Sequence, residues 1–376
     1  MTRRVAILGT RGYPSYYGGF ETLLRTLVPY LAEKGWEVDV YGRRGATSSD
    51  QLPDGVRSVV LPGLDLKSTS TLSYGFTAAL HAAFSKYDAV LVMNVANGYW
   101  LPILKVAKTR TIVNVDGIEW KRDKWGKFAK AVFQRGANLT AKYADYLVAD
   151  AEEIARVWDE EYSRTSTFIP YGGHGMVSAA VAQSRIAELL LVPREYILFV
   201  ARFVPENTIQ EFLQAARKLS ETSDVVIVGS SGYGGPWDEA ASKLAADRPR
   251  VKWLGHLRDD ELLFALWQNA GVYFHGHSVG GTNPALVQAM ACGAPTIARD
   301  TVYNREVLAD SGRFVEPTSE AIVDATSSLL LDSVEQSRMS NASVARQNDL
   351  YTWDGVCQRY ESLLLEALQP ATKVAK

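Results

Sequence analysis

The stretch RVAILGTRGYPSYYGGFETLLRTLVPYLAEKGWEVDVYGR, residues 4–43, decides the fold. It begins with the apolar run RVAILG, which predicts a buried strand that ends at a glycine. After a loop, the leucines of FETLLRTLVPYLAEKG (20–35) recur at helical spacing up to Gly35, the expected C-cap. EVDVYGR (37–43) predicts a second strand. A strand, a helix and a strand with short links form a βαβ unit, so the sequence predicts a parallel sheet.

The same pattern continues and then restarts, which indicates two α/β domains. The first set of strands leads to STFIPYGG (166–173), a predicted strand that enters a Pro/Gly hinge. YILFVAR (196–202) begins a second set, and YTWDGVCQRYESLLLEALQ (351–369) predicts a long amphipathic helix. The other predicted strands are 88–94, 109–117, 144–150, 223–232, 251–257, 271–276, 294–300 and 312–317.

A chain of 376 residues is too long for one ordinary core. We predict an N-terminal Rossmann-like domain, 1–172, and a C-terminal one, 173–350, with the last helix, about 351–368, crossing back to the first domain. Two doubly wound domains of this kind would face each other across a cleft. Because open α/β sheets bind ligands at the carboxyl ends of their strands, this arrangement favours a two-substrate enzyme.

Composition limits the class of protein and its compartment. The formal net charge of −2 gives no overall attraction to nucleic acid. The segment from Lys105 to Lys142 is nevertheless basic, with ten Lys/Arg and three Asp/Glu. Cys292 and Cys357 are too few for a disulfide framework and fit a reducing cytosol. The short N-terminal apolar run predicts a strand rather than a signal peptide, and the chain lacks an 18-residue apolar run. We expect a cytoplasmic protein that binds no nucleic acid.

HGHSVGGTNPALVQAMACGAP (275–295) predicts an anion site at a strand-to-helix turn. Gly280 and Gly281 let a ligand approach the backbone closely, since glycine has no Cβ. Asn283 is a good N-cap, and Pro284 suits the first helical position. The first-turn N–H groups and the helix dipole favour phosphate there. The alternative is a plain capped helix that follows a flexible turn.

This stretch resembles the nucleotide-sugar-binding motif of family 4 retaining glycosyltransferases, which have the GT-B fold. LVQAMACGAP (286–295) matches their helix, and GHSVGGTNPALVQAMA is similar to the branch that includes bacterial rhamnosyltransferases of capsule and cell-wall polysaccharide synthesis. Four further stretches resemble the same branch, so the likeness runs from about residue 4 to 360. They are GTRGYPSYYGGFET (9–22), NVDGIEWKRDKW (114–125), ARFVPENTIQEF (201–212) and RDTVYNREVL (299–308).

The resemblance implies a metal-independent glycosyltransferase of the GT-B fold. The expected reaction moves L-rhamnose from dTDP-rhamnose to a saccharide or lipid-linked acceptor in cell-surface polysaccharide or glycoconjugate synthesis. The nucleotide-sugar is a co-substrate, and no cofactor is expected. Two alternatives stay open: a GT-B nucleotide-sugar epimerase, which needs more cleft carboxylates than the sequence offers, and a catalytically weak sugar-nucleotide-binding relative.

The resemblance places the donor residues mainly in the second domain. Arg202 ends the strand YILFVAR and matches the family arginine that grips the donor diphosphate, while Asn207 stands where the broad family has a lysine. The alternative for Arg202 is an ion pair with Glu206 or Asp238. The predicted donor-binding residues are Gly18, Gly19, Asn207, Gly255, His256, Leu257, His277, Val279, Gly280, Gly281, Thr282, Asn283 and Gln288.

Two positions depart from the family's pair of glutamates eight residues apart. They are Gly280, which suits the glycine-rich loop of the branch, and Gln288. In the family the second glutamate grips the ribose hydroxyls. Glutamine can accept and donate hydrogen bonds but lacks the charge, so we expect donor binding to be weaker by about 1–2 kcal/mol.

Acceptor residues are expected at the strand ends of the first domain. Asp116 follows the strand TIVNV and can polarise or position an acceptor hydroxyl, whereas a helix cap at 117–119 is the alternative. Tyr16 and Tyr17 can stack on sugar faces or simply cover the sheet edge. The predicted catalytic residues are Asp116 and Arg202, and the predicted acceptor-binding residues are Tyr16, Tyr17, Glu21, Asn94, Glu119 and Trp120.

Residues 120–133 carry aromatic side chains at helical spacing beside several lysines. Such a segment can contact the inner face of a membrane that holds a lipid-linked acceptor. The alternative is a helix that faces the core and has a solvated basic side. No metal site is expected, because the five histidines are scattered along the chain.

Overall fold

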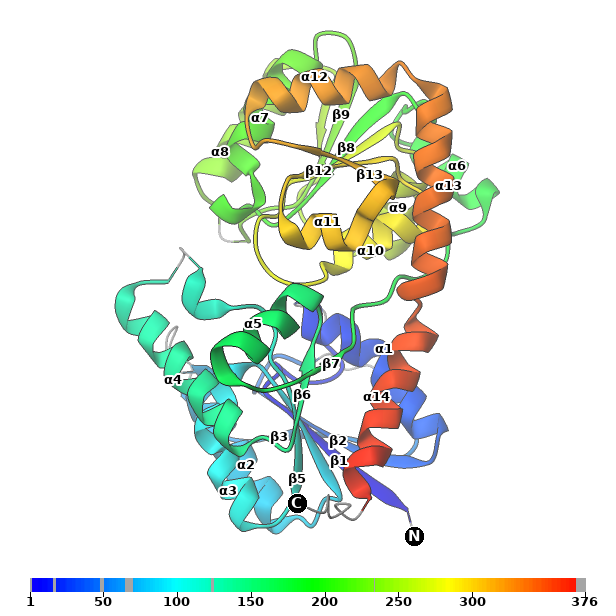
Figure 1. Ribbon diagram of the computed structural model, residues 1–376. Helices are drawn as coiled ribbons and strands as arrows, with labels where there is room; N and C mark the ends of the chain where they lie inside the picture. The colour runs from blue at the N-terminus through cyan, green and yellow to red at the C-terminus, as the bar shows by residue number, and fades with distance from the viewer. Residues whose placement is uncertain are drawn as a thin grey trace. The chain divides into compact units, whose positions relative to one another are not determined.

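The structure is a computed structural model that describes residues 2–15, 18–47, 51–64, 70–122, 125–232 and 234–369 (Figure 1). It divides into two compact units. The first comprises Met1–Tyr171 with Trp353–Lys376, and the second comprises Gly172–Thr352. Each unit contains one parallel sheet with helices on its faces, so the predicted pair of doubly wound α/β domains is confirmed.

The first unit is built on a seven-stranded sheet in the order β3-β2-β1-β4-β5-β6-β7. Its strand β1 has Val5, Ala6 and Ile7 fully buried, as expected for a parallel strand covered on both faces. The strands are β1 (Arg3–Leu8), β2 (Trp36–Gly42), β3 (Val56–Val60), β4 (Ala89–Met93), β5 (Arg110–Asn114), β6 (Tyr146–Ala149) and β7 (Thr167–Phe168). The helices are α1 (Gly19–Glu33), α2 (Ser70–Phe84), η1 (Val95–Trp100), α3 (Leu101–Val106), η2 (Glu119–Lys121), α4 (Lys127–Tyr143), α5 (Glu152–Tyr162) and α14 (Trp353–Leu368).

The C-terminal helix α14 packs into the core of the first unit, beside α1 (Figure 1). Its residues Trp353, Cys357, Tyr360 and Leu364 repeat at helical spacing and share one apolar cluster with β1 and α1. The Tyr360 hydroxyl also accepts a hydrogen bond from Asn114 Nδ2 at 2.7 Å. This buried stripe is the reason why the last helix joins the first unit, as the sequence predicted.

The second unit is built on a six-stranded parallel sheet in the order β10-β9-β8-β11-β12-β13. The strands are β8 (Tyr196–Val200), β9 (Asp224–Val228), β10 (Val251–Trp253), β11 (Val272–His275), β12 (Thr296–Arg299) and β13 (Gly312–Val315). The helices are α6 (Ala179–Ala187), η3 (Pro205–Asn207), α7 (Ile209–Leu219), α8 (Pro236–Asp247), α9 (Asp260–Asn269), α10 (Pro284–Ala291), α11 (Val302–Leu308), η4 (Ala309–Ser311), α12 (Ser319–Leu330) and α13 (Ser333–Leu350).

Each sheet has a point at which the strand order reverses. It lies between β1 and β4 in the first unit and between β8 and β11 in the second. Open parallel sheets bind ligands at this point, outside the carboxyl ends of the strands. The loops that follow these four strands are therefore the first places to look for candidate functional residues.

Several predicted strands are shorter in the structure than in the sequence pattern. The strand predicted over 223–232 ends at Val228, because Gly229 has a φ of 135°. The strand predicted over 166–173 shrinks to β7, and β3 and α2 were not predicted. The C-cap of α1 is Lys34, and Gly35 follows it with a φ of 81°. Among the described residues, the helices lack the combination of length and apolar character that a membrane crossing requires.

Candidate functional site

Two loops meet at the switch point of the second unit. The hydroxyl of Thr208, in the loop after β8, donates a hydrogen bond to the carbonyl oxygen of Gly276, which follows β11, at 2.6 Å. The backbone N–H and the hydroxyl of Ser278 both donate to the carbonyl oxygen of Glu206, at 2.9 and 2.8 Å. A Cβ on Gly276 would lie 2.4 Å from the Asn207 carbonyl oxygen, so this approach requires glycine. The two loops thus form one continuous surface.

Arg202 is exposed on the first of these loops, two residues after β8 ends. Among the residues that the structure describes, its guanidinium makes neither a hydrogen bond nor an ion pair. Asp238, one of the two acids considered as its partner, instead accepts hydrogen bonds from Ser230 and Ser231. An exposed guanidinium that the protein does not engage can bind two phosphate oxygens of a ligand.

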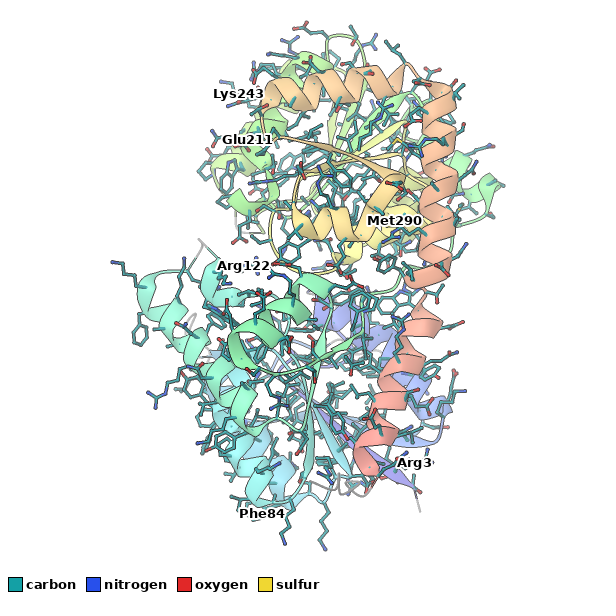
Figure 2. The ribbon with its side chains drawn as sticks, in the orientation of Figure 1. Arg3, Phe84, Arg122, Glu211, Lys243 and Met290 are labelled. Carbon is teal, nitrogen blue, oxygen red and sulfur yellow. The ribbon has the colours of Figure 1, made fainter. Side chains whose placement is uncertain are left out.

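The start of α10 confirms the predicted cap. Asn283 Oδ1 accepts a hydrogen bond from the Ala285 N–H at 2.9 Å, and Pro284 is the first helical residue. Gly280 has a φ of 99°, and a Cβ built there would meet no atom within 4 Å. Open space therefore adjoins the glycine turn in front of the helix. The far side of α10 is core, with Met290 fully buried (Figure 2).

Gln288, on the next turn of α10, is engaged inside the second unit. Its Oε1 accepts a hydrogen bond from the His174 N–H at 2.9 Å, and its Nε2 donates to the His174 carbonyl oxygen at 3.1 Å. Nε2 also donates to Cys292 Sγ at 3.4 Å. Gln288 is only 7% exposed. The amide thus clamps the backbone at His174 onto α10, a contact that the sequence did not indicate.

His275, the last residue of β11, and His277, two residues beyond it, form a stacked pair with ring centroids 4.4 Å apart. His275 is fully buried, and its Nδ1 lies 2.9 Å from the Tyr273 hydroxyl. Burial, followed by the neighbouring His277, holds the pKa of His275 well below its usual value. The carbonyl oxygen of His277 accepts a hydrogen bond from Asn304 Nδ2 at 2.9 Å. His275 is therefore a neutral core residue, and half-buried His277 lies at the candidate site.

We expect the buried His275 to make the protein less stable in mild acid. Unfolded His275 takes up a proton below about pH 6.5, whereas the folded residue does not, so unfolding becomes easier as the pH falls. This residue contributes at most about 1.4 kcal/mol per pH unit. Urea unfolding between pH 7.5 and pH 5 should show a shallower pH dependence for His275→Gln than for the wild type. Equal slopes for the two proteins would contradict this account.

The remaining predicted donor residues lie at a neighbouring strand end or in the same glycine turn. Gly255 follows β10, with a φ of 63°, and its carbonyl oxygen accepts a hydrogen bond from the Gly229 N–H at 2.7 Å. His256 is exposed and Leu257 is half-buried. In the turn before α10, Val279 and Gly281 are half-buried and Thr282 is buried. Asn207 directs its side-chain amide to the Arg202 carbonyl oxygen at 2.8 Å.

In the first unit, Asn94 and Asp116 follow the adjacent strands β4 and β5. Both have left-handed backbones, with φ values of 72° and 54°, which non-glycine residues adopt mainly at special sites. Asn94 Nδ2 donates to Asp116 Oδ2 at 3.3 Å. Asp116 does not cap the following helix, since the N-cap of η2 is Ile118 and no side chain caps it. The structure thus brings these two predicted residues together and removes the capping alternative.

Asp150 was missed by sequence reasoning and lies close to the same strand ends. It follows β6 and is 3% exposed. The pKa of buried Tyr171 is raised well above its usual value by burial and then by the charges of Asp116 and Asp150. The ADYLVAD motif ends on this aspartate, which is the signal that could have identified it.

The loop after β1 leads to the N-terminus of α1. Gly18 is the N-cap of α1 and has no side chain to cap the first turn, and Gly19 is the first helical residue. Glu21 is 5% exposed and accepts a hydrogen bond from the Arg11 N–H at 3.0 Å, so it supports the loop from within. Tyr16 and Tyr17 lie outside the described residues.

Glu119 and Trp120 make contacts inside the first unit. Glu119 is 4% exposed, and its carboxylate accepts hydrogen bonds from Arg122 Nη1 (Figure 2) and Trp125 Nε1, each at 2.6 Å. Trp120 is 8% exposed and packs edge-on against Trp158. These contacts account for both side chains, and their placement adds no support for the acceptor role that the sequence predicted.

A small, shallow concavity in the first unit was also missed by sequence reasoning. It lies at the carboxyl ends of β1 and β2, where Gly9 and Gly42 form part of its wall. The Arg43 guanidinium lies 5.5 Å from the Tyr74 ring at this site and donates a hydrogen bond to the Thr71 hydroxyl at 3.3 Å. Among the described residues, no cluster of three or more histidine, cysteine or acidic side chains is arranged to hold a metal.

Comparison with known proteins gives two family matches. Residues 183–346, within the second unit, match the family "Glycosyl transferases group 1". Residues 94–174 match a domain of unknown function, DUF1972. O-antigen chain mannosyltransferase B of Escherichia coli is 27% identical over 166 residues, which are 42% of this chain and 42% of that protein. The match thus spans about two fifths of the length of this curated relative.

Solved structures match over nearly the whole chain. Sucrose-phosphate synthase from Thermosynechococcus elongatus is 18% identical, with a TM-score of 0.81, and the match covers 97% of this chain and 98% of that one. HepE from Anabaena, solved in complex with UDP-glucose, is 13% identical, with a TM-score of 0.76 and coverage of 97% and 99%. The GT-B fold is therefore confirmed, and the family match supports a glycosyltransferase enzyme.

Proposed function

We propose that this protein transfers a sugar from a nucleoside-diphosphate donor to a saccharide or lipid-linked acceptor. The observation that carries the proposal is Arg202 at the switch point of the second unit, an exposed guanidinium with no partner among the described residues. Its loop is hydrogen-bonded, through the Glu206 carbonyl oxygen and Ser278, to the loop that contains the open glycine turn before α10. The Arg202 guanidinium and the backbone N–H groups of the glycine turn together suit a diphosphate, which gains negative charge as the sugar leaves. Residues 183–346, which match a glycosyltransferase family, contain both features.

The donor sugar is proposed from two different leads. The likeness of the 275–295 stretch to rhamnosyltransferases favours L-rhamnose carried by dTDP, with retention of configuration. The Escherichia coli relative is a mannosyltransferase of O-antigen chains, which favours mannose and supports a role in cell-surface polysaccharide synthesis. We retain dTDP-rhamnose as the first donor to test and mannose as the second.

The acceptor is proposed to bind the first unit. Asn94 and Asp116 are linked by a hydrogen bond at adjacent strand ends, and Asp116 is half-buried rather than enclosed. A carboxylate in that setting can orient an acceptor hydroxyl or accept its hydrogen bond.

The test is a screen of thermal shifts followed by an assay of transfer. Saturation with a ligand at a hundred times its Kd stabilises the native state by about 2.7 kcal/mol, so the correct nucleoside diphosphate should raise the Tm clearly. The best sugar nucleotide is then incubated with candidate saccharides and lipid-linked sugars. Transfer supports the proposal. Interconversion of the donor sugar without an acceptor would indicate an epimerase, and binding without turnover would indicate a binding protein.

Membrane contact through α4 is part of the proposal for lipid-linked acceptors. Phe128 is 83% exposed on α4, next to Lys127, which suits a basic amphipathic surface. We expect Phe128→Ser to reduce co-sedimentation with phosphatidylglycerol vesicles by about tenfold, the effect of withdrawing one aromatic side chain from lipid. Phe84→Ser is the matched control, since Phe84 is 81% exposed on α2 (Figure 2). Equal losses for the two variants would exclude α4 as the contact.

A further inference from the structure

Arg299 is a second guanidinium at the switch point of the second unit. It is the last residue of β12, the strand beside β11. Its Nη1 donates a hydrogen bond to the Thr208 hydroxyl at 3.2 Å, although Thr208 belongs to the loop after β8, on the other side of β11. The side chain therefore extends across the end of β11 and reaches the loop that carries Arg202.

The backbone around Arg299 is held in place by a polar network. Asn304 Nδ2 donates both to the Arg299 carbonyl oxygen at 2.8 Å and to the His277 carbonyl oxygen at 2.9 Å. The Thr208 hydroxyl in turn donates a hydrogen bond to the Gly276 carbonyl oxygen. The ends of β8, β11 and β12 are thus linked through buried or half-buried groups, and the guanidinium has a defined position.

The positive charge of Arg299 is not neutralised by the described residues. Its side chain is half-buried and makes no ion pair among them. The adjacent Asp300 is engaged by Arg305 through two bonds of 2.5 and 2.7 Å. Glu206, the acidic residue of the loop 201–208, forms an ion pair with neither Arg299 nor Arg202. A half-buried charge without a counter-ion is costly, and an anionic ligand would relieve that cost.

The Thr208 contact also leaves most of the guanidinium available. An arginine carries five N–H donors, and Arg299 uses one of them in its hydrogen bond to Thr208. The Asn207 side chain, one residue before Thr208, is turned to the Arg202 carbonyl oxygen and brings no charge. The Arg299 guanidinium, at the end of β12, therefore contacts the same loop that carries Arg202.

We propose that Arg299 binds the diphosphate of the donor as the second cation beside Arg202. The inference rests on the proposed function, because it assumes that the donor is a nucleoside diphosphate. A diphosphate carries more than one negative charge, so a single exposed guanidinium leaves part of that charge unmatched. Arg299 supplies the second charge from β12, a strand that the sequence did not connect with the donor.

The test compares nucleoside diphosphates with their nucleosides by titration calorimetry. dTDP, UDP and GDP are titrated first, and the tightest is then used together with its nucleoside. Arg299→Gln keeps an amide that can reach Thr208 but removes the charge. We expect it to weaken diphosphate binding by about 10- to 100-fold, the effect of one charged hydrogen-bond partner, and to leave nucleoside binding nearly unchanged.

Two further variants separate ligand contact from support of the fold. Arg217→Gln removes an exposed charge on the last turn of α7 whose guanidinium has no partner among the described residues, so it should leave diphosphate affinity within about twofold. Asn207→Lys places a cation beside Thr208 and should restore part of the affinity lost by Arg299→Gln. Unchanged diphosphate binding in Arg299→Gln, or an equal loss for diphosphate and nucleoside, would overturn the inference. If the wild type binds none of the three diphosphates, the proposed function itself fails.

Discussion

Arg202→Ala is expected to lower kcat/KM with the sugar-nucleotide donor by about 10- to 100-fold and to leave the fold intact. A hydrogen bond to a charged group contributes about 1.5–3 kcal/mol, and a guanidinium can form two such bonds with a diphosphate. Arg202 is exposed, and its guanidinium makes no hydrogen bond or ion pair among the described residues that the substitution would break. The loss should therefore appear in catalysis and donor binding, with the Tm nearly unchanged.

Arg217 provides the matched control for this experiment. It is exposed on the last turn of α7, and its guanidinium also lacks a partner among the described residues. α7 begins just after the candidate loop and runs away from it, so Arg217 lies away from the carboxyl ends of the strands. Arg217→Ala should retain full activity. Equal losses in the two variants would mean that the overall charge of the unit, rather than the position of Arg202, governs donor binding.

Gln288→Glu is expected to destabilise the second unit by about 1–3 kcal/mol at neutral pH, even though it restores the residue typical of the family. The substitution removes the donor to the His174 carbonyl oxygen and sets a carboxylate against that oxygen. It also removes the donor to Cys292 Sγ. In a unit of this size the loss corresponds to a fall in Tm of about 2–4 °C per kcal/mol.

The pH dependence of this variant identifies the cause. Burial beside a carbonyl oxygen should raise the pKa of the introduced carboxyl in the folded state, and the protonated form can again donate to His174. A raised folded pKa means that the deficit is largest above that pKa and shrinks as the pH falls. Urea unfolding of Gln288→Glu and the wild type at pH 7.5 and pH 5 should therefore converge at the lower pH.

Gln214→Glu is the control, because Gln214 is exposed on α7 and the same change there should be nearly neutral. The result also decides between two roles for Gln288. Higher stability or tighter donor binding in Gln288→Glu would support the ribose contact that the sequence predicted for this position. Lower stability without a gain in donor affinity would leave Gln288 as the clamp on His174.

Elements with strong local patterns were predictable from the sequence. The apolar run at Val5–Ile7 is fully buried, and α14 presents a stripe that packs in the first unit. The Asn283-Pro284 start of α10 was also predictable, because capping depends on residues only two or three positions apart. β3 was missed and β7 was predicted too long, since short strands at the edge of a sheet have little apolar periodicity.

The candidate residues likewise divide into those that a local sequence pattern indicates and those that depend on contacts between distant segments. Arg202 and Asp116 could be placed at the functional edge because each follows a recognisable buried strand. Arg299 also ends a predicted strand, but its contact with Thr208 joins positions 91 residues apart and depends on the order of β8, β11 and β12. Likewise, the contact between Gln288 and His174 spans 114 residues, and no local pattern indicates it.

The sequence by itself determined two parallel α/β units, the return of the last helix to the first unit, and the glycine turn before α10, because each depends on the spacing of nearby residues. Only the tertiary structure decided which side chains already have hydrogen-bond or packing partners within the protein. Gln288, Glu119 and Trp120 have partners inside their units, whereas the Arg202 guanidinium makes no hydrogen bond or ion pair among the described residues. That distinction depends on hydrogen bonds and packing between distant segments, which exist only after the chain has folded.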